Sequence, residues 1–426
     1  MDSTEYQQKL ARMESSTLLP VLEVAEARFI RGLATTYRFT YQELRQVSLA
    51  ARDLGMWREP ALQLWWEGTE RTTTGSGKYR KKALLQELAK HVATLAASAK
   101  VYPESGSAVR PRRRVQLQEK KTSRRVLGLC PAYSEETVCC GLHTLDAVRG
   151  CPFSCSYCTI QTFYGESAEL EEDLAGKLAD LDLDPHRKYH IGTGQASDSL
   201  VWGNRGGILD ALLGFAADNP NVLLELKTKS DNVGYILENE APKNIVCSWS
   251  LNTPVIVDNE EHFTASLDER LDAARRVADR GVGVAFHFHP MVYYDGWPEG
   301  YAGVAKRIID LFDSTEVSFV SLGSITLIKP VIKKIRDLGN PTKILQMELV
   351  PDPHGKLTYP DAVKVEMFQT MHEALAPWHE DVFMYLCMEK AQIWERALGR
   401  SYASNDEFEL DFARHMTTGA KVGRSR

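Results

Sequence analysis

The sequence predicts an α/β protein, a full or partial parallel β/α barrel preceded by an N-terminal helical region. From about residue 143, short apolar runs alternate with amphipathic stretches, as strands and helices do around a parallel sheet. The apolar runs show no polar face, which is typical of strands buried on both sides. Six or seven such units favour a barrel over an open sheet.

The first hundred residues are expected to be helical. Apolar residues recur at three- and four-residue intervals over 17–34, 40–55 and 81–99. Trp57, Trp65 and Trp66 are expected to pack in a core, and residues 72–77, TTTGSG, are expected to form a loop. The expected domains are an N-terminal helical region (1–100), a basic linker (101–128), the barrel (129–360) and a C-terminal helical extension (361–426).

The basic linker carries a concentrated charge. Residues 110–126 hold eight lysines and arginines against one acid, and residues 78–82 add four more positive charges. The run is either a solvated linker or a phosphate-binding strip, and both interpretations stay open. Residues 78–125 are therefore a candidate contact for nucleic acid.

Composition excludes several other classes of protein. The net charge of −6 over 426 residues gives no overall attraction to polyanions. No apolar run approaches the roughly 20 residues of a membrane helix, and the polar N-terminus is no secretory signal. Eight cysteines are too sparse for a disulfide scaffold, so we expect a cytoplasmic protein without a membrane partner.

The elements of the barrel are expected in a regular order. Ser266 and Glu269 form a capping box that begins one helix, which Gly281 can end. The other expected helices span 168–181, 206–217 and 362–375. The expected strands span 142–148, 188–194, 222–228, 244–250, 282–288, 317–323 and 343–349.

Three cysteines follow the first expected strand, where a barrel places its chemistry. Cys151, Cys155 and Cys158 are spaced C-x3-C-x2-C. Three thiolates in one loop suit iron–sulfur or zinc. Structural zinc takes four ligands, and Cys139 or Cys140 could add one, so zinc stays open. A four-iron cluster on three cysteines would leave one iron free to bind a cofactor.

Other polar residues lie at expected strand ends. His287 and His289 alternate on one strand and share a face, where lining of a substrate cavity is favoured over a metal site. Cys247 lies on a strand with its side chain opposite that of Ser248, and its face cannot be assigned from the sequence.

The chain resembles the radical S-adenosylmethionine superfamily, and within it the spore photoproduct lyase family. The resemblance covers about residues 125–400. It rests on CPFSCSYCTIQTFYG, TGQASDSL, LLELKTKSDNV, CSWSLNT, TASLDERLDAARRVADRGVGVAFHFHP, VSLGSI and YLCMEKAQIW, which occur in the family's order. It implies a barrel of the radical S-adenosylmethionine type, a [4Fe-4S] cluster on the three cysteines, and S-adenosylmethionine as cofactor. The enzymes of this family repair a thymine photoproduct in DNA.

The resemblance also implies roles for single residues. Tyr157 matches a tyrosine of the family, Lys229 would meet the methionine carboxylate, and Asn252 would face the adenosine. The segment expected to hold S-adenosylmethionine contains Gly194, Ser197, Asp198 and Ser199. An electron donor such as flavodoxin or ferredoxin is the implied partner.

The sequence departs from the family at two positions. The lyases carry a hydrogen-donor cysteine just before the Ser197–Asp198 pair, and residues 191–199 contain none. A tyrosine that follows the third cluster cysteine is Thr159 here. Cys247, assigned as catalytic, is the expected substitute, with Cys139 and Cys140 as alternatives.

The sequence is compatible with three functions. The first is photoproduct-lyase-like radical chemistry on a nucleic-acid lesion. The second is the same chemistry on a small molecule or peptide in a biosynthetic pathway. The third is a metal-binding module that recognises nucleic acid without catalysis.

Overall fold

The computed structural model describes residues 2–103, 115–164 and 167–418. The chain divides into two compact units, one formed by residues 1–110 with 328–349 and the other by residues 111–327 with 350–426. Among the described residues, no helix is long and apolar enough to cross a bilayer.

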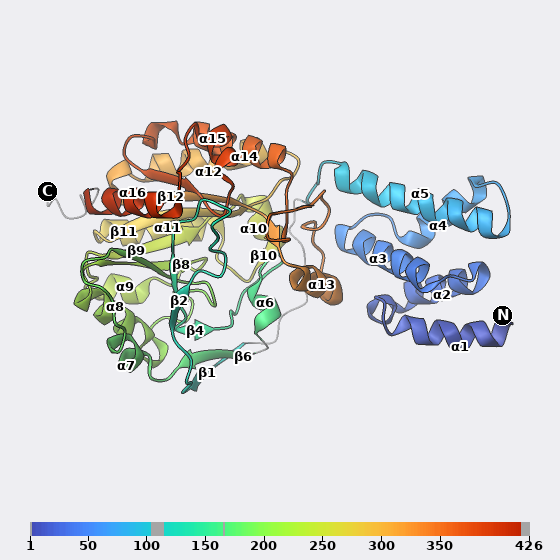
Figure 1. The fold of residues 1–426 in the computed structure, drawn as a ribbon, viewed down its shortest axis with the longest axis horizontal. Coiled ribbons are helices and arrows are strands. Elements are labelled where there is room, and N and C mark those ends of the chain that lie inside the picture. Colours follow the sequence, from blue (N-terminus) through green and yellow to red (C-terminus); the bar gives the residue numbers. More distant parts are fainter. Residues whose placement is uncertain (1, 104–114, 165–166, 419–426) are drawn as a thin grey trace. The chain divides into compact units, whose positions relative to one another are not determined.

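The first unit is helical, as the sequence predicted (Figure 1). A capping box of Thr40 and Glu43 begins α3, and Trp66 is fully buried in the core of the helices. Residues 73–76, within the loop expected over 72–77, connect α4 to α5. The helices of this unit are α1 (Ser3–Glu14), η1 (Leu19–Val21), α2 (Val24–Tyr37), α3 (Tyr41–Trp57), α4 (Leu62–Thr72), α5 (Gly77–Ala97) and α13 (Lys329–Leu338).

A late segment of the chain completes this unit. Arg336 in α13 forms a two-pronged ion pair with Asp53, at 2.8 Å for each bond. The Lys343 ammonium donates to the Trp57 carbonyl oxygen at 2.6 Å, and Ile344 is fully buried. The expected strand over 343–349 is therefore wrong, because its apolar residues fill the helical unit. The sequence-based limits of 129–360 had placed this segment in the barrel.

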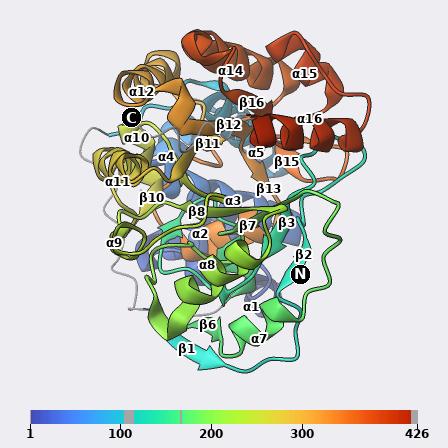
Figure 2. The ribbon, with the colours of Figure 1, turned by 90° about the vertical axis from the view of Figure 1, so that its left-hand side faces the viewer.

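An eight-stranded sheet forms the second unit, with the order β16-β12-β11-β9-β8-β7-β3-β2. Every neighbouring pair is parallel except β2 with β3, and the open sheet curls into a half barrel (Figure 2), which confirms the partial parallel barrel. Its strands are β2 (Leu127–Leu129), β3 (His143–Leu145), β7 (Tyr189–Thr193), β8 (Val222–Thr228), β9 (Ile245–Ser250), β11 (Gly283–Met291), β12 (Val317–Ser324) and β16 (Phe383–Leu386).

Helices follow the strands and cover the outer face of the sheet, as α8 and α11 do (Figure 2). The capping box of Ser266 and Glu269 begins α11 as predicted. The α-helices are α6 (Ile160–Phe163), α7 (Leu174–Ala179), α8 (Ile208–Asp218), α9 (Gly234–Glu238), α10 (Pro254–Glu260), α11 (Leu267–Asp279), α12 (Trp297–Leu311), α14 (Asp361–Ala374), α15 (Ala391–Leu398) and α16 (Asn405–Thr418).

Short strands form smaller sheets beside the half barrel, in the orders β1-β6-β4, β10-β5 and β13-β15-β14. The expected helix over 168–181 begins as strand β6, because Ala168 and Leu170 are buried while Glu169 between them is more exposed, a period of two. These strands are β1 (Gln116–Lys120), β4 (Val148–Arg149), β5 (Ser154–Cys155), β6 (Ser167–Glu171), β10 (Glu261–His262), β13 (Thr326–Leu327), β14 (Val350–Pro351) and β15 (Leu357–Thr358).

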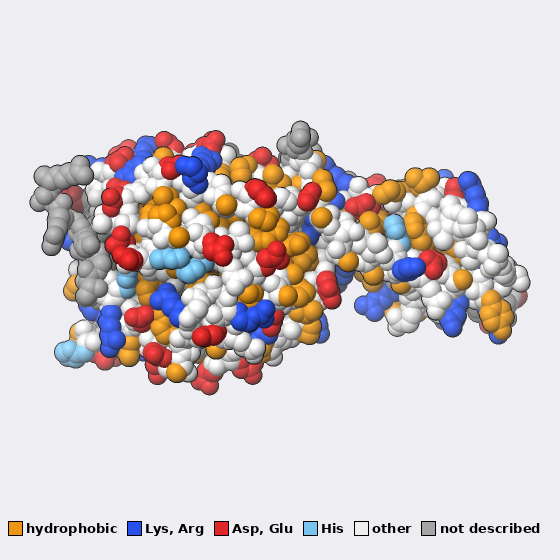
Figure 3. Space-filling model, turned by 90° about the horizontal axis from the view of Figure 1, so that it is seen from above, with side chains coloured by type: hydrophobic (Ala, Val, Ile, Leu, Met, Phe, Trp, Pro, Cys, Tyr) orange, Lys and Arg blue, Asp and Glu red, His pale blue; other side chains and the backbone are white. Residues whose placement is uncertain are grey.

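The basic segment is only partly described. Residues 110–114 lie outside the described residues. Lys81 in α5 pairs with Glu43 at 2.9 Å, and Lys120 in β1 pairs with Glu169 at 2.7 Å. On the face shown in Figure 3, basic side chains are scattered among acidic ones.

Candidate active site

A cavity of about 290 Å³ lies at the carboxyl ends of the parallel strands of the second unit. In β/α barrels this edge carries the chemistry, because the loops that follow the strands converge there. Residues at or just beyond the ends of six strands line it: Gly194, Thr228, Ser250, His289, Ser324 and Cys387.

The loop that carries the three cysteines forms one wall of this cavity, with Cys151, Cys155 and Cys158 all exposed to it. Gly150 has a φ of +91°, a left-handed conformation that glycine adopts without strain. Its N–H donates to the Ala196 carbonyl oxygen at 2.9 Å, and its own carbonyl oxygen accepts from the Ser197 hydroxyl at 2.7 Å. These bonds fix the start of the cysteine loop to the loop that follows β7.

The three cysteines fit a four-iron cluster in chemistry and placement. All eight cysteines are free thiols, and burial raises the pKa of Cys151 and of Cys155. Their protons would therefore leave when metal binds. Among the described residues, no three histidine, cysteine or acidic side chains converge on a single-ion position. A cluster does not need such convergence, because each thiolate binds its own iron.

The loop after β7 closes tightly on β8. Gly194 has a φ of +97°, and a Cβ atom there would lie 2.8 Å from the Lys227 carbonyl oxygen. The Asp198 carboxylate accepts from the Lys229 N–H at 2.6 Å and from the Thr228 hydroxyl at 2.8 Å. Gly194, Ser197 and Asp198 line the cavity, and their role as cofactor-binding residues stays a prediction.

Ser199 does not line the cavity, although the sequence grouped it with those residues. Its hydroxyl lies 2.6 Å from the Thr193 hydroxyl, and its N–H donates to the Lys227 carbonyl oxygen at 3.1 Å. Ser199 therefore holds the loop against the neighbouring strands.

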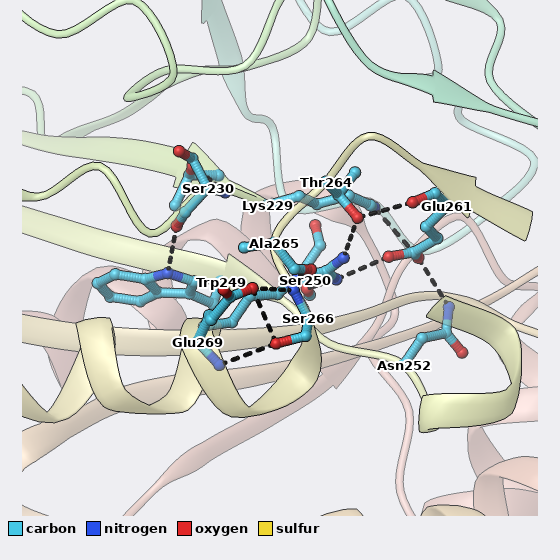
Figure 4. A network of polar contacts seen from close by, with 12 residues as sticks. Lys229, Ser230, Trp249, Ser250, Asn252, Glu261, Thr264, Ala265, Ser266 and Glu269 are labelled. Carbon is cyan, nitrogen blue, oxygen red and sulfur yellow. Dashed lines mark hydrogen bonds and ion pairs between the residues drawn. The ribbon is translucent and has the colours of Figure 1, made fainter. Parts of the chain in front are cut away.

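Glu261 is the centre of a buried ionic network that the sequence did not predict (Figure 4). Its carboxylate lies 2.6 Å from Arg270 and 3.5 Å from the Lys229 ammonium, and it accepts a hydrogen bond from the Tyr157 hydroxyl. Burial alone would raise the pKa of Glu261, but Lys229 and Arg270 bring that pKa to about 2. The carboxylate thus holds Lys229 and Tyr157 at the wall beside the cysteines, where both line the cavity.

Asn252 belongs to this network and does not line the cavity (Figure 4). It is fully buried, and its amide nitrogen donates to Glu261 at 3.1 Å and to the Pro290 carbonyl oxygen at 3.0 Å. Its side-chain oxygen accepts from the Tyr301 hydroxyl at 2.6 Å. The polar atoms of Asn252 thus bind protein groups, and its contact with adenosine stays a prediction.

The two histidines of β11 lie on one face, as predicted, but at different depths. His289 lines the cavity, and its Nε2 atom lies 2.7 Å from the Ser321 hydroxyl. His287 lies deeper, with its Nε2 atom 2.6 Å from the Glu225 carboxylate, which also contacts His190 at 2.8 Å. A buried polar cluster therefore forms the floor beneath the cavity.

Comparison with known proteins shows a family resemblance in the barrel region. The family model of spore photoproduct lyase matches residues 143–348, which include the cysteine loop, Lys229 and Glu261. This part of the chain is therefore similar to the spore photoproduct lyase family.

Curated relatives match part of the chain. The spore photoproduct lyase of Clostridium acetobutylicum is 24% identical over 183 residues, 42% of this chain and 54% of that protein. The enzyme of a Geobacillus species is 22% identical over 249 residues, 55% of this chain and 73% of that protein. The chain thus spans about half the length of the first and three quarters of the second.

A solved structure shares the fold. Spore photoproduct lyase complexed with dinucleoside spore photoproduct superposes with a TM-score of 0.55 at 20% identity, covering 63% of this chain and 81% of that one. A variant of the lyase with bound S-adenosylmethionine and the same dinucleoside gives a TM-score of 0.53 with the same identity and coverage.

The structure corrects the expected replacement for the missing donor cysteine of the family. Ala196 occupies the position before the Ser197–Asp198 pair. Ser248 of β9 donates to Glu225 inside the half barrel, so Cys247, its neighbour in the strand, points to the opposite face. Cys247 is fully buried and does not line the cavity. Its thiol therefore does not face the space beside the three loop cysteines.

Another thiol does reach the cavity, and sequence reasoning missed it. Cys387 follows β16, its N–H donates to the Leu322 carbonyl oxygen at 2.8 Å, and its side chain lines the cavity. Burial raises the pKa of this thiol. The available signal was the run Val-Phe-Met-Tyr-Leu before it, whose branched and aromatic residues are typical of a strand.

Proposed function

We propose that this protein is a radical S-adenosylmethionine enzyme of the spore photoproduct lyase type. One observation carries the proposal: the three loop cysteines, Lys229 and Gly194 line a single cavity at the carboxyl ends of parallel strands. Cofactor motifs in their expected structural context are specific indicators of chemistry.

Different residues of the cavity would bind the cluster and the cofactor. Cys151, Cys155 and Cys158 would hold a [4Fe-4S] cluster, which when bound supplies the electron that cleaves S-adenosylmethionine to methionine and a 5′-deoxyadenosyl radical. Lys229 offers its ammonium to the methionine carboxylate, held in position by Glu261. Gly194 lets the loop after β7 pack directly against Lys227, and this loop would carry Ser197 and Asp198 to the cofactor. A flavodoxin or ferredoxin is the proposed electron donor.

The proposed substrate is a pyrimidine lesion in nucleic acid. The support comes from the family similarity of residues 143–348 and from the solved relatives, one of which is complexed with dinucleoside spore photoproduct. Residues 78–125 would contact the phosphates of a longer strand through their basic side chains.

In this proposal, Cys387 donates a hydrogen atom to the substrate radical. The substrate radical forms a C–H bond with the thiol hydrogen while the S–H bond of Cys387 breaks, which leaves a thiyl radical. One electron from the donor protein and one proton from water then restore the thiol. Burial keeps the thiol protonated by raising its pKa, so the S–H bond is available.

A second candidate is the same chemistry on a small molecule or peptide. The observation that favours it is the double departure at Ala196 and Thr159, where the lyases carry the residues of their hydrogen-return path. Under this candidate the radical is consumed by a different substrate, and nucleic acid plays no part.

Anaerobic reconstitution tests the proposal. The protein should bind iron and sulfide near four each, and it should release 5′-deoxyadenosine from S-adenosylmethionine under reduction. Dinucleoside spore photoproduct should raise that release and be converted to two thymidines. Release without any response to the lesion would favour the second candidate. Stoichiometric zinc would favour a metal-binding module without catalysis.

A further inference from the structure

Two lysines at the end of β8 line the cavity, and only one of them has a counter-ion. Lys229 pairs with Glu261 at 3.5 Å. Lys227 is directed into the same cavity, and within the described residues no hydrogen bond or ion pair engages its ammonium. Burial lowers the pKa of Lys227, and the charge of the Glu225 carboxylate opposes that shift only in part.

The acidic groups nearby are already occupied. Asp198 is the only acidic residue that lines the cavity among the described residues, and its carboxylate accepts bonds from Thr228 and from three backbone N–H groups. Glu225, two residues before Lys227 on the same face of β8, is held by His190, His287 and Ser248. Neither carboxylate lies within ion-pair distance of Lys227.

Lys229 and Lys227 lie at different ends of the cavity. Lys229 lies at the cysteine loop, because its ammonium is 5.6 Å from the centre of the Tyr157 ring. At the other end, burial raises the pKa of the Cys387 thiol, and the nearby positive charge that opposes this shift is Lys227. His289 and Gly323 complete this second end, with the imidazole packed so closely on Gly323 that a Cβ atom would meet it at 3.0 Å.

We propose that Lys227 binds an anionic group of the substrate, a phosphate or a carboxylate, at the Cys387 end of the cavity. This inference rests on the proposed function for the division between cofactor and substrate ends. A bound anion would supply the counter-charge that Lys227 lacks, and charge-assisted bonds to phosphate and carboxylate are strong in partly desolvated sites. It would also hold the substrate beside the Cys387 thiol.

The first test uses inorganic phosphate and the full chain without cluster, so that binding is read without enzyme activity. Calorimetry compares the wild type with K227M, which keeps the length of the side chain and removes its charge, and with K227R, which keeps the charge. K227Q serves as a second neutral variant in case K227M does not fold. K306M is the matched control, because Lys306 is an exposed lysine of α12.

The expected result is phosphate binding about tenfold or more weaker in K227M, with K227R and K306M close to the wild type. Equal phosphate affinity in the wild type and both neutral variants would overturn the proposal. Loss of S-adenosylmethionine affinity with unchanged phosphate affinity would also overturn it, because Lys227 would then serve the cofactor's carboxylate.

The second test compares dinucleoside spore photoproduct, which lacks a phosphate, with the corresponding dinucleotide. The wild type should bind the dinucleotide more tightly, and K227M should lose that preference, which would identify the anion as the substrate's phosphate. If neither photoproduct binds while K227M still loses inorganic phosphate, the anion site stands and the lesion substrate of the proposed function fails. A dinucleotide preference that K227M retains would count against Lys227.

Discussion

Replacing Glu261 by glutamine should destabilise the second unit and weaken cofactor binding together. The carboxylate is fully buried between Arg270, at 2.6 Å, and Lys229, at 3.5 Å, and the Arg270 side chain has no exposed surface. Glutamine has nearly the same volume, so packing is kept while the negative charge is lost. Arg270 would then be a buried cation without its counter-ion.

The size of the effect follows from that geometry. Removing one partner of a buried ion pair costs about 3–5 kcal/mol, because the remaining charge stays desolvated. Glutamine can still accept the bond from Asn252, and Arg270 keeps its bond to the Ser250 carbonyl oxygen at 2.8 Å. We therefore expect a loss near the lower limit, about 3 kcal/mol.

Guanidinium chloride unfolding of the cluster-free protein measures this loss. D310N is the control, because Asp310 pairs with Lys306 on the surface and such exposed pairs contribute less than about 1 kcal/mol. If E261Q lowers the free energy of unfolding no more than D310N does, the ionic network around Glu261 does not stabilise the second unit. The same variant should bind S-adenosylmethionine more weakly, since Lys229 loses the carboxylate that positions it.

Other changes test separate parts of the site. Alanine at any one of the three loop cysteines should abolish both the visible cluster band and cofactor cleavage, and a variant that keeps both would refute the cluster assignment. K229A should weaken S-adenosylmethionine binding about tenfold to a hundredfold with the cluster intact, as equilibrium binding would show. C387A should still cleave the cofactor but lose the solvent deuterium that the wild type places in its product, whereas C247A should match the wild type; deuterium retained by C387A would exclude Cys387 as donor. Neutralising Arg112–Arg114 should lower the salt slope of nucleic-acid binding by about two to three, and an unchanged slope would remove these residues from the interface.

The sequence by itself determined the features that depend on neighbours along the chain. The cysteine spacing, the capping box of Ser266 and Glu269, and the alternation of strands and helices are local patterns, and their positions in the fold followed from them. The approach of Lys229 to the cysteine loop was predictable from the expected fold, since the ends of parallel strands meet at one edge of a sheet.

Tertiary structure alone decided which side chains face the cavity and which charges are paired. The face of Cys247 depends on which side of β9 carries Ser248 toward Glu225, and strand periodicity leaves that choice open. Cys387 reaches the cavity because β16 pairs with β12, a contact between segments more than sixty residues apart. Glu261 satisfies Lys229 and leaves Lys227 without a counter-ion, which no spacing in the sequence reveals, because electrostatic pairing depends on distance in space and on the exclusion of water.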